Sequence, residues 1–262
     1  MPTVPEDHVE PAHPSRVNDY DSLAEAYAVE NETGIMNAYY ERPAILALAG
    51  EVTGRRILDA GCGSGPLFAA LRERGAAVSG IDNSTGMLEL ARRRLGDGAD
   101  LQVADLCDPL PFPDGAFDDV IASLVLHYLE DWGPTLSEMR RVLRTGGRLI
   151  VSVDHPMMVY AQHRLAGRKV SYFGTRNSLE EWTMGGRTVP MSFWHRPLHA
   201  MTDAFTAAGF RLAVVSEQQP VPEARELFPD EFRSLATTPS FLFFVLRADQ
   251  GPPRGPVSPA LR

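Results

Sequence analysis

The chain has 262 residues, of which 44% are hydrophobic and 23% charged, so it can bury a sizeable core, and its length favours one large domain. Lysine and arginine number 25 against 34 aspartate and glutamate, and this net charge of −9 is poorly suited to binding nucleic acid or anionic membranes. Two cysteines without a C-x-x-C spacing support neither a disulfide framework nor a zinc cluster, and they favour a cytoplasmic location. No segment approaches the roughly 18 apolar residues that a membrane helix needs.

The two ends of the chain differ in composition from its middle. Residues 1–16 and 249–262 each contain four prolines and lack hydrophobic periodicity, so we expect disordered tails. Between them we expect a single domain over residues 17–248. It starts with one or two helices over residues 17–50, which we expect to cap the site, and Tyr27 in this segment is a candidate substrate contact.

Short apolar segments alternate with helical patterns through the middle of the chain. Apolar residues recur every three or four positions in the segments between the strands, as amphipathic helices require. Alternating strands and helices predict a parallel, doubly wound sheet. The five strands expected in this region cover residues 56–60, 77–82, 101–105, 120–124 and 149–153.

The last third of the chain completes the sheet. A helix over residues 198–208 precedes strands at 210–216 and 241–246, and we expect the last strand to be antiparallel. The fold class is therefore α/β, a Rossmann-like sheet of seven strands that is mostly parallel. Residues 157–196, rich in glycine and aromatic residues, form a long insertion after the fifth strand, which we interpret as a substrate cover.

A glycine-rich turn follows the first expected strand, at residues 57–65. Gly61, Gly63 and Gly65 give the spacing G-x-G-x-G, whereas nicotinamide and flavin folds prefer G-x-G-x-x-G. Asp59, two residues before the first glycine, would repel a pyrophosphate and attract the ammonium group of an amino acid. This turn favours a ligand with a cationic end over a nicotinamide dinucleotide.

Two further acidic residues end the next two expected strands. Asp82 lies 21 residues after Gly61, where a carboxylate can accept hydrogen bonds from both ribose hydroxyls. Asp105 lies where a carboxylate can accept from an exocyclic adenine amine. A nucleoside joined to an amino acid indicates S-adenosylmethionine as the cofactor.

These motifs resemble the class I S-adenosylmethionine-dependent methyltransferases, especially the small-molecule group that includes ubiquinone and menaquinone biosynthesis enzymes. The resemblance covers about residues 50–155, including a fourth-strand motif at 117–129 and a helix–turn–strand motif at 139–149. It implies that the methionine end, ribose and adenine of the cofactor are held by a set of residues at the strand ends. That set is Asp59, Gly61, Cys62, Gly63, Asp82, Asn83, Met87, Asp105, Leu106 and Ser123.

Methyl transfer from a sulfonium is a direct displacement, so the protein mainly aligns the reactants and excludes water. If the acceptor loses a proton, a histidine is the usual base. His127 and His155 follow the fourth and fifth strands at the expected ligand edge, and His195 ends the insertion. These three are the candidate catalytic residues, and for each of them a packing role is the alternative.

The end of the insertion combines groups suited to holding an acceptor. Trp194 supplies an aromatic wall, His199 an imidazole, and Arg196 a guanidinium that could bind an acidic substrate. Asp118 and Asp119 precede the fourth strand, at the edge opposite the ligand, so we expect no catalytic role for them. We also expect no metal ion.

The sequence thus predicts a methyltransferase that acts on an oxygen, nitrogen or carbon atom of a small-molecule acceptor. We expect a monomer or homodimer that binds neither nucleic acid nor membranes. The alternative is a protein of the same fold that binds the cofactor but catalyses another reaction or only binds a ligand. A nicotinamide oxidoreductase is disfavoured by the glycine spacing and Asp59.

Overall fold

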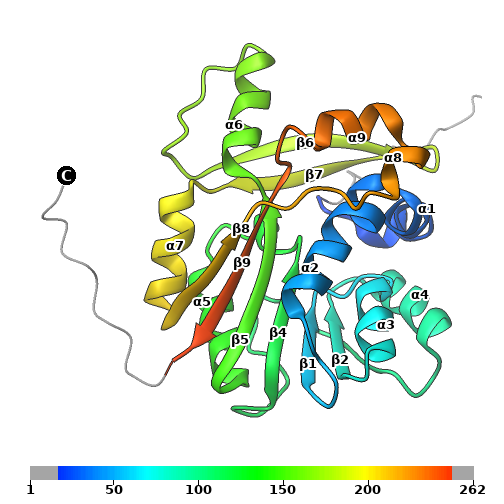
Figure 1. Ribbon diagram of the computed structural model, residues 1–262, viewed down its shortest axis with the longest axis vertical. Helices are drawn as coiled ribbons and strands as arrows, with labels where there is room; N and C mark the ends of the chain where they lie inside the picture. The colour runs from blue at the N-terminus through cyan, green and yellow to red at the C-terminus, as the bar shows by residue number, and fades with distance from the viewer. Residues whose placement is uncertain (1–16, 250–262) are drawn as a thin grey trace, which may run out of the picture.

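The centre of the molecule is a sheet of seven strands in the order β3-β2-β1-β4-β5-β9-β8 (Figure 1). The computed structural model describes residues 17–249. The first five strands run parallel, and β9 is antiparallel to both of its neighbours, as predicted. The strands are β1 (Arg56–Ala60), β2 (Ala77–Asp82), β3 (Asp100–Val103), β4 (Phe117–Ser123), β5 (Leu143–Asp154), β8 (Phe210–Ser216) and β9 (Phe241–Ala248).

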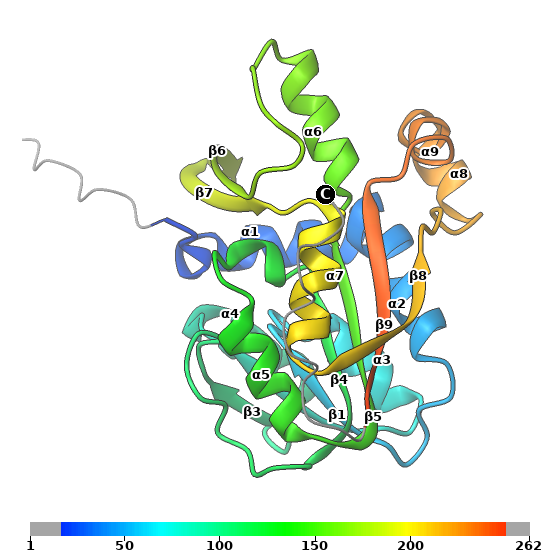
Figure 2. The same cartoon turned by 90° about the vertical axis from the view of Figure 1, so that its left-hand side faces the viewer.

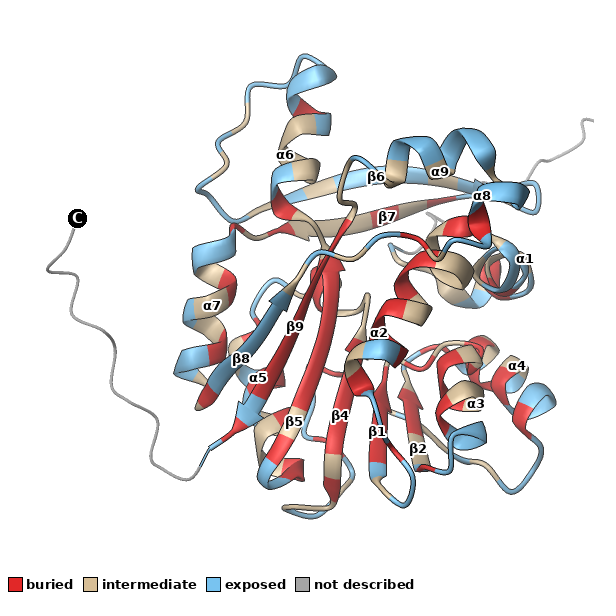
Figure 3. Cartoon of the chain, viewed as in Figure 1, coloured by how far each residue is buried: buried red, intermediate tan, exposed pale blue. Residues whose placement is uncertain are grey.

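Helices cover both faces of this sheet, and successive residues of each central strand point to opposite faces. One core packs the even-numbered residues Leu58 and Val120 against α5 and α7, and the other packs Ile57 and Ile121 against α2 and α3. Figure 3 shows the buried residues concentrated in the central strands. The helices that flank the sheet are α2 (Arg42–Ala49), α3 (Pro66–Glu73), α4 (Thr85–Leu95), α5 (Gly133–Val142) and α7 (Leu198–Ala207).

The strand order reverses at β1, which has β2 on one side and β4 on the other. In open α/β sheets this reversal opens a crevice outside the carboxyl ends of the strands. The N-terminal segment covers that crevice: α1 (Tyr20–Thr33) packs on α4, and a π-helical turn, η1 (Asn37–Glu41), continues into α2. Only α1 and η1 have the position of a cap, because α2 belongs to the buried layer on the sheet.

The insertion after β5 is ordered structure and not a loop. It contains α6 (Pro156–Leu165) and a hairpin of β6 (Arg176–Met184) and β7 (Arg187–His195). The hairpin turns at Gly185 and Gly186, both at positive φ, which a two-residue hairpin turn of type I′ requires. Figures 1 and 2 show the hairpin above the carboxyl ends of the parallel strands, where the predicted cover should lie.

Smaller elements complete the description. A short 3-10 helix, η2 (Leu126–Tyr128), follows β4, and α8 (Ala224–Leu227) and α9 (Pro229–Leu235) connect β8 to β9. The predicted tails lie outside the described residues, apart from Asp249, whose carboxylate pairs with Arg211. Among residues 17–249, no helix is long and apolar enough to cross a membrane.

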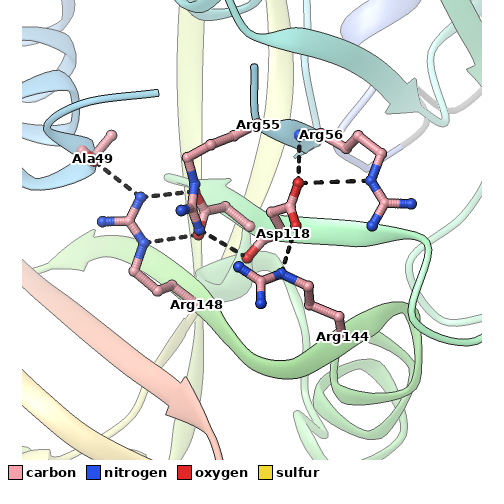
Figure 4. A network of polar contacts seen from close by, with 7 residues as sticks. Ala49, Arg55, Arg56, Asp118, Arg144 and Arg148 are labelled. Atoms are coloured by element: carbon pink, nitrogen blue, oxygen red, sulfur yellow. Dashed lines mark hydrogen bonds and ion pairs between the residues drawn. The ribbon is translucent and has the colours of Figure 1, made fainter. Parts of the chain in front are cut away.

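The amino ends of the central strands carry a network of charged side chains (Figure 4). Asp119 is fully buried and accepts hydrogen bonds from Arg55 at 2.7 Å and from Arg148 at 2.7 and 2.8 Å. Asp118 accepts from the backbone amide of Arg56 and from Arg144. Burial alone would raise the pKa of Asp119, but the two arginines outweigh it and hold this pKa below its usual value.

Candidate active site

A cavity of 180 Å³ opens at the carboxyl ends of β1, β2 and β4. It is the crevice that the strand order predicts, and α1 and η1 close one side of it. The structure therefore brings together most of the residues that the sequence assigned to the cofactor. Those that line this cofactor cavity are Asp59, Gly61, Cys62, Gly63, Asp82, Asn83, Met87, Leu106 and Ser123.

The glycine-rich turn forms the floor of the cofactor cavity. Gly61, Gly63 and Gly65 have φ angles of 81°, 54° and 79°, in the left-handed region that favours glycine. A Cβ on Gly61 would also lie 2.8 Å from the side chain of Val125. The chain therefore turns sharply at the end of β1, and its backbone stays accessible to a ligand.

Asp82 is fixed at the end of β2 by backbone amides. Its carboxylate accepts from the amide of Gly63 at 2.9 Å and from the amide of Ser84 at 2.9 Å. Burial raises the pKa of Asp82, and these hydrogen bonds oppose that rise. A carboxylate has about four acceptor positions, so two amides leave capacity for two ribose hydroxyls.

Two more carboxylates lie on the wall of the cofactor cavity, and neither is in an ion pair within the described part of the chain. Glu41 is 3% exposed and accepts from the hydroxyls of Ser123 at 2.7 Å and Ser152 at 2.5 Å. Asp59 is 1% exposed, and its Oδ2 atom has no hydrogen-bond partner among residues 17–249. Burial, followed by the charges of Glu41 and Asp82, raises the pKa of Asp59 to about 7.

A guanidinium faces the same cavity from the start of α2. Arg42 donates to the backbone oxygen of Asn31 at 2.6 Å and to its side-chain oxygen at 2.8 Å. Burial lowers the pKa of Arg42. The cavity thus offers buried carboxylates for an ammonium group and a guanidinium for a carboxylate, which fits the amino-acid end of S-adenosylmethionine.

Sequence reasoning missed Glu41 and Arg42. They lie where the π-helical turn η1 passes into α2, and single π-turns are frequent at functional sites. An extra residue in a helical turn leaves no periodic mark that separates it from an ordinary helix. An acid beside an arginine in a predicted helix was the only local signal.

The predicted adenine contacts divide into two groups. Leu106 lines the cavity, but Asp105 does not; its side chain is exposed and accepts from the amide of Cys107 at 2.8 Å. That hydrogen bond turns the carboxylate back onto its own loop. A role for Asp105 with adenine stays a prediction.

A second, larger cavity of 520 Å³ adjoins the first. Tyr27, Asn37, Leu124 and Tyr128 line both cavities, so these residues mark the seam between them. Leu124 directly follows β4 and has a φ of 48°, a strained conformation for a residue other than glycine and one that recurs at functional sites. We call this second space the acceptor cavity.

His127 lies on the wall of the acceptor cavity beside the seam. It is 8% exposed, and its ring packs edge-on against Tyr128 and Phe193. Its Nδ1 atom is 3.2 Å from a carboxylate oxygen of Asp154, although the angle is not that of a hydrogen bond. Burial lowers the pKa of His127 and the charge of Asp154 opposes this, so the imidazole is neutral near pH 7.

The other two histidines predicted as catalytic lie farther from the seam. His155 lines neither cavity, because it precedes α6 and its ring turns outward to bond Glu217 at 2.8 Å. His195 lines the acceptor cavity, with Nε2 2.8 Å from the backbone oxygen of Tyr172. Burial lowers the pKa of His195.

The predicted substrate contacts lie mostly where they were expected. Tyr27, Trp194 and Arg196 line the acceptor cavity, and Tyr27 stacks on Trp182 at 6.4 Å between ring centroids. His199 is exposed on α7 and lines neither cavity. The hairpin and α1 thus build the aromatic wall together.

Comparison with known proteins supports the same interpretation. Residues 58–151 match the family model described as a methyltransferase domain. An uncharacterized protein of Haemophilus influenzae is 27% identical, covering 88% of this chain and 96% of that protein. Demethylmenaquinone methyltransferase of Clavibacter sepedonicus is 38% identical over 50% of this chain and 55% of that enzyme, so the chain spans only about half the length of this relative.

A solved structure extends the match beyond the residues of the family model. The S-adenosylmethionine-dependent methyltransferase of Mesorhizobium loti is 28% identical, with a TM-score of 0.61 over 78% of this chain and 96% of that one. These findings support a class I S-adenosylmethionine-dependent methyltransferase, with S-adenosylmethionine as the cofactor.

Proposed function

We propose that this protein transfers a methyl group from S-adenosylmethionine to a small-molecule acceptor bound in the acceptor cavity. The observation that carries the proposal is the seam at Leu124 and Tyr128, where the two cavities meet beside His127. A relative that is a demethylmenaquinone methyltransferase agrees with a small acceptor, but this chain spans only about half of that enzyme. We therefore do not propose a quinone as the acceptor of this protein.

The cofactor supplies a methyl group on a sulfonium, which leaves as a neutral thioether when the methyl carbon bonds to the acceptor. The chain's own residues align the acceptor and exclude water from the seam. Tyr27, Trp182 and Phe193 form an apolar wall, with Trp182 and Phe193 5.4 Å apart between centroids. This wall keeps the acceptor atom facing the cofactor cavity.

His127 is our candidate for the base, in preference to His155 and His195. Its neutral imidazole can take the proton that a hydroxyl or protonated nitrogen loses, and Asp154 stabilises the imidazolium that results. Its Nδ1 atom faces Asp154, which leaves Nε2 as the nitrogen that would face an acceptor in the cavity that His127 lines. An acceptor that loses no proton would not need His127.

The proposal is tested by measuring S-adenosylhomocysteine formation with a panel of phenols, carboxylic acids and amines. We expect turnover with at least one class of acceptor, and His127→Asn should lower kcat about 100-fold while cofactor affinity stays unchanged. His199→Asn, an exposed histidine on α7, is the matched control and should retain full activity. Tight cofactor binding without product from any acceptor would instead support the alternative of a fold that binds the cofactor for another purpose.

A further inference from the structure

The hairpin runs along the acceptor cavity. The base of the hairpin, where β6 begins and β7 ends, lies at one end of this cavity, and the tip of the hairpin lies toward the other end. Arg176 pairs with His195 in the register, so both residues point to the same face of the hairpin as Ser178 and Phe193. Ser178, Phe193 and His195 line the acceptor cavity, which shows that this face is turned toward it. Arg196 lines the cavity next to them.

Several nitrogen atoms at the hairpin base are buried and have no partner within the described part of the chain. These are one terminal nitrogen of Arg176, the Nε of Arg196 and the Nδ1 of His195. Buried donors in native proteins are nearly always hydrogen-bonded, and leaving one unsatisfied is costly. Arg196 and His195 line the acceptor cavity, whereas Arg176 does not line it and lies across the hairpin from His195. The unpaired donor of Arg196 on the cavity wall points to a missing acceptor of hydrogen bonds.

The charges around these atoms have one dominant sign. Burial lowers the pKa of Arg176 and of Arg196, and neither forms an ion pair with a carboxylate among residues 17–249. Arg168 adds a third guanidinium, bonded to His163 at 3.0 Å on the cavity wall. Burial lowers the pKa of His163, and the charges of Arg176 and Arg168 lower it further.

Carboxylates near this end of the cavity do not neutralise the arginines. Glu180, the acid on the same face of β6, lines the cavity, but it is exposed and forms no ion pair with these arginines within the described part of the chain. Asp154 lies beside His127, nearer the seam. Asp131 acts on Arg196 through its charge alone, while the guanidinium packs 4.7 Å from the ring of Trp132 and donates to the backbone oxygen of Glu130.

We propose that the methyl acceptor carries an oxyanion, a carboxylate or a phosphate, which Arg196 binds at the base of the hairpin, while Arg176 adds positive charge from behind His195. This inference rests on the proposed function, because it assigns the acceptor to the larger cavity. Phe193 contacts His127, and His195 lies two residues farther along β7, a distance of about 7 Å. The anionic group of the acceptor is therefore separated from the atom that receives the methyl group by about the width of an aromatic ring.

Intrinsic fluorescence can test this proposal without knowledge of the natural acceptor. The chain has three tryptophans, Trp132, Trp182 and Trp194, and all of them line the acceptor cavity. Benzoate, phenyl phosphate and the uncharged benzamide would be titrated into the full chain saturated with S-adenosylhomocysteine. We expect benzoate or phenyl phosphate to bind at least about tenfold more tightly than benzamide, and the stronger of the two identifies the oxyanion.

Substitutions then locate the site. Arg196→Gln should remove most of the preference for the anionic probe and Arg176→Gln a smaller part of it, both with unchanged benzamide binding, whereas Arg196→Lys should retain more of the preference than Arg196→Gln. Arg187→Gln, at the exposed tip of the same hairpin, is the matched control and should change nothing. Equal affinity for charged and uncharged probes, no binding of any probe, or a preference that survives both glutamine variants would overturn the proposal.

The outcome is separable from that of the proposed function. Failure of S-adenosylhomocysteine to bind would contradict the methyltransferase proposal. If the protein without S-adenosylhomocysteine still binds the anionic probes more tightly than benzamide, the oxyanion site would be established on its own. Binding of both, with no preference for the anionic probes, would leave methyl transfer in place and contradict only the oxyanion.

Discussion

The two ends of the parallel strands both bury carboxylates, but they treat them in opposite ways. At the amino ends, Asp119 accepts hydrogen bonds from Arg55 and Arg148, and its charge is compensated within the fold. At the carboxyl ends, Asp59 and Glu41 are equally buried and form no ion pair in the described part of the chain. The first group stabilises the sheet, whereas the second is poised for a cation from outside.

The pKa shifts show the same contrast in physical terms. Burial disfavours a charged carboxylate at both ends. At Asp119 the arginines reverse this effect, and the pKa lies below its usual value. At Asp59 no cation opposes burial, and the pKa rises to about 7. A buried acid without a counterion is a recurrent sign of a functional site.

The largest expected effect concerns the amino ends. Asp119→Asn leaves the partly buried Arg55 and Arg148 without this counterion and should lower the free energy of unfolding by about 3 kcal/mol, measured by urea denaturation. Asp114→Asn, which removes an 81% exposed partner of Arg141, should cost less than about 0.5 kcal/mol. Equal small losses for both variants would contradict a structural role for the buried network.

The next effect concerns the carboxyl ends. Asp82→Asn should weaken S-adenosylhomocysteine binding about 100-fold, because a neutral amide replaces the carboxylate that would accept from the ribose. Titration calorimetry measures this directly. Asp118→Asn is the control at the opposite edge, where we expect some loss of stability and unchanged affinity. Unchanged affinity in Asp82→Asn would remove the ribose assignment.

A smaller effect is expected from pH. The pKa of Asp59 is about 7 in the free protein, and only the deprotonated carboxylate can pair with an ammonium group. The affinity for S-adenosylhomocysteine should therefore weaken about tenfold when the pH falls from 8 to 6. Between about pH 4 and pH 7 the native state holds a proton on Asp59 that the unfolded state has lost, so the stability of the free protein falls as pH rises through this window. Calorimetry across pH should show the change in affinity, and a flat profile would contradict it.

Much of the sheet could be predicted because its signals are local. Each central strand is a short apolar segment, and the glycine turn after β1 with the acid at the end of β2 has a fixed spacing. The hairpin was predicted only as a cover, because polar residues such as Glu180 and Glu181 interrupt the apolar pattern of β6. Its strands are stabilised by each other and by α1, which no local pattern reveals.

The candidate site was predictable to the same limited extent. Residues on the strand ends were found because topology brings those ends together, whereas Glu41 enters the cavity only through the packing of η1 against β4 and β5. His155 shows the converse error of reasoning. It follows a strand at the correct edge, yet its ring turns to Glu217, because the direction of a side chain depends on tertiary contacts.

We infer that the buried acids at the carboxyl ends of the strands, Asp59 and Glu41, bind the ammonium group of the cofactor. The most direct test compares S-adenosylhomocysteine with methylthioadenosine, which lacks the amino-acid end, in wild-type protein and in Asp59→Asn. We predict that the variant loses most of the affinity advantage of S-adenosylhomocysteine and binds methylthioadenosine as the wild type does. An equal loss of affinity for both ligands, or no loss for either, would contradict the account.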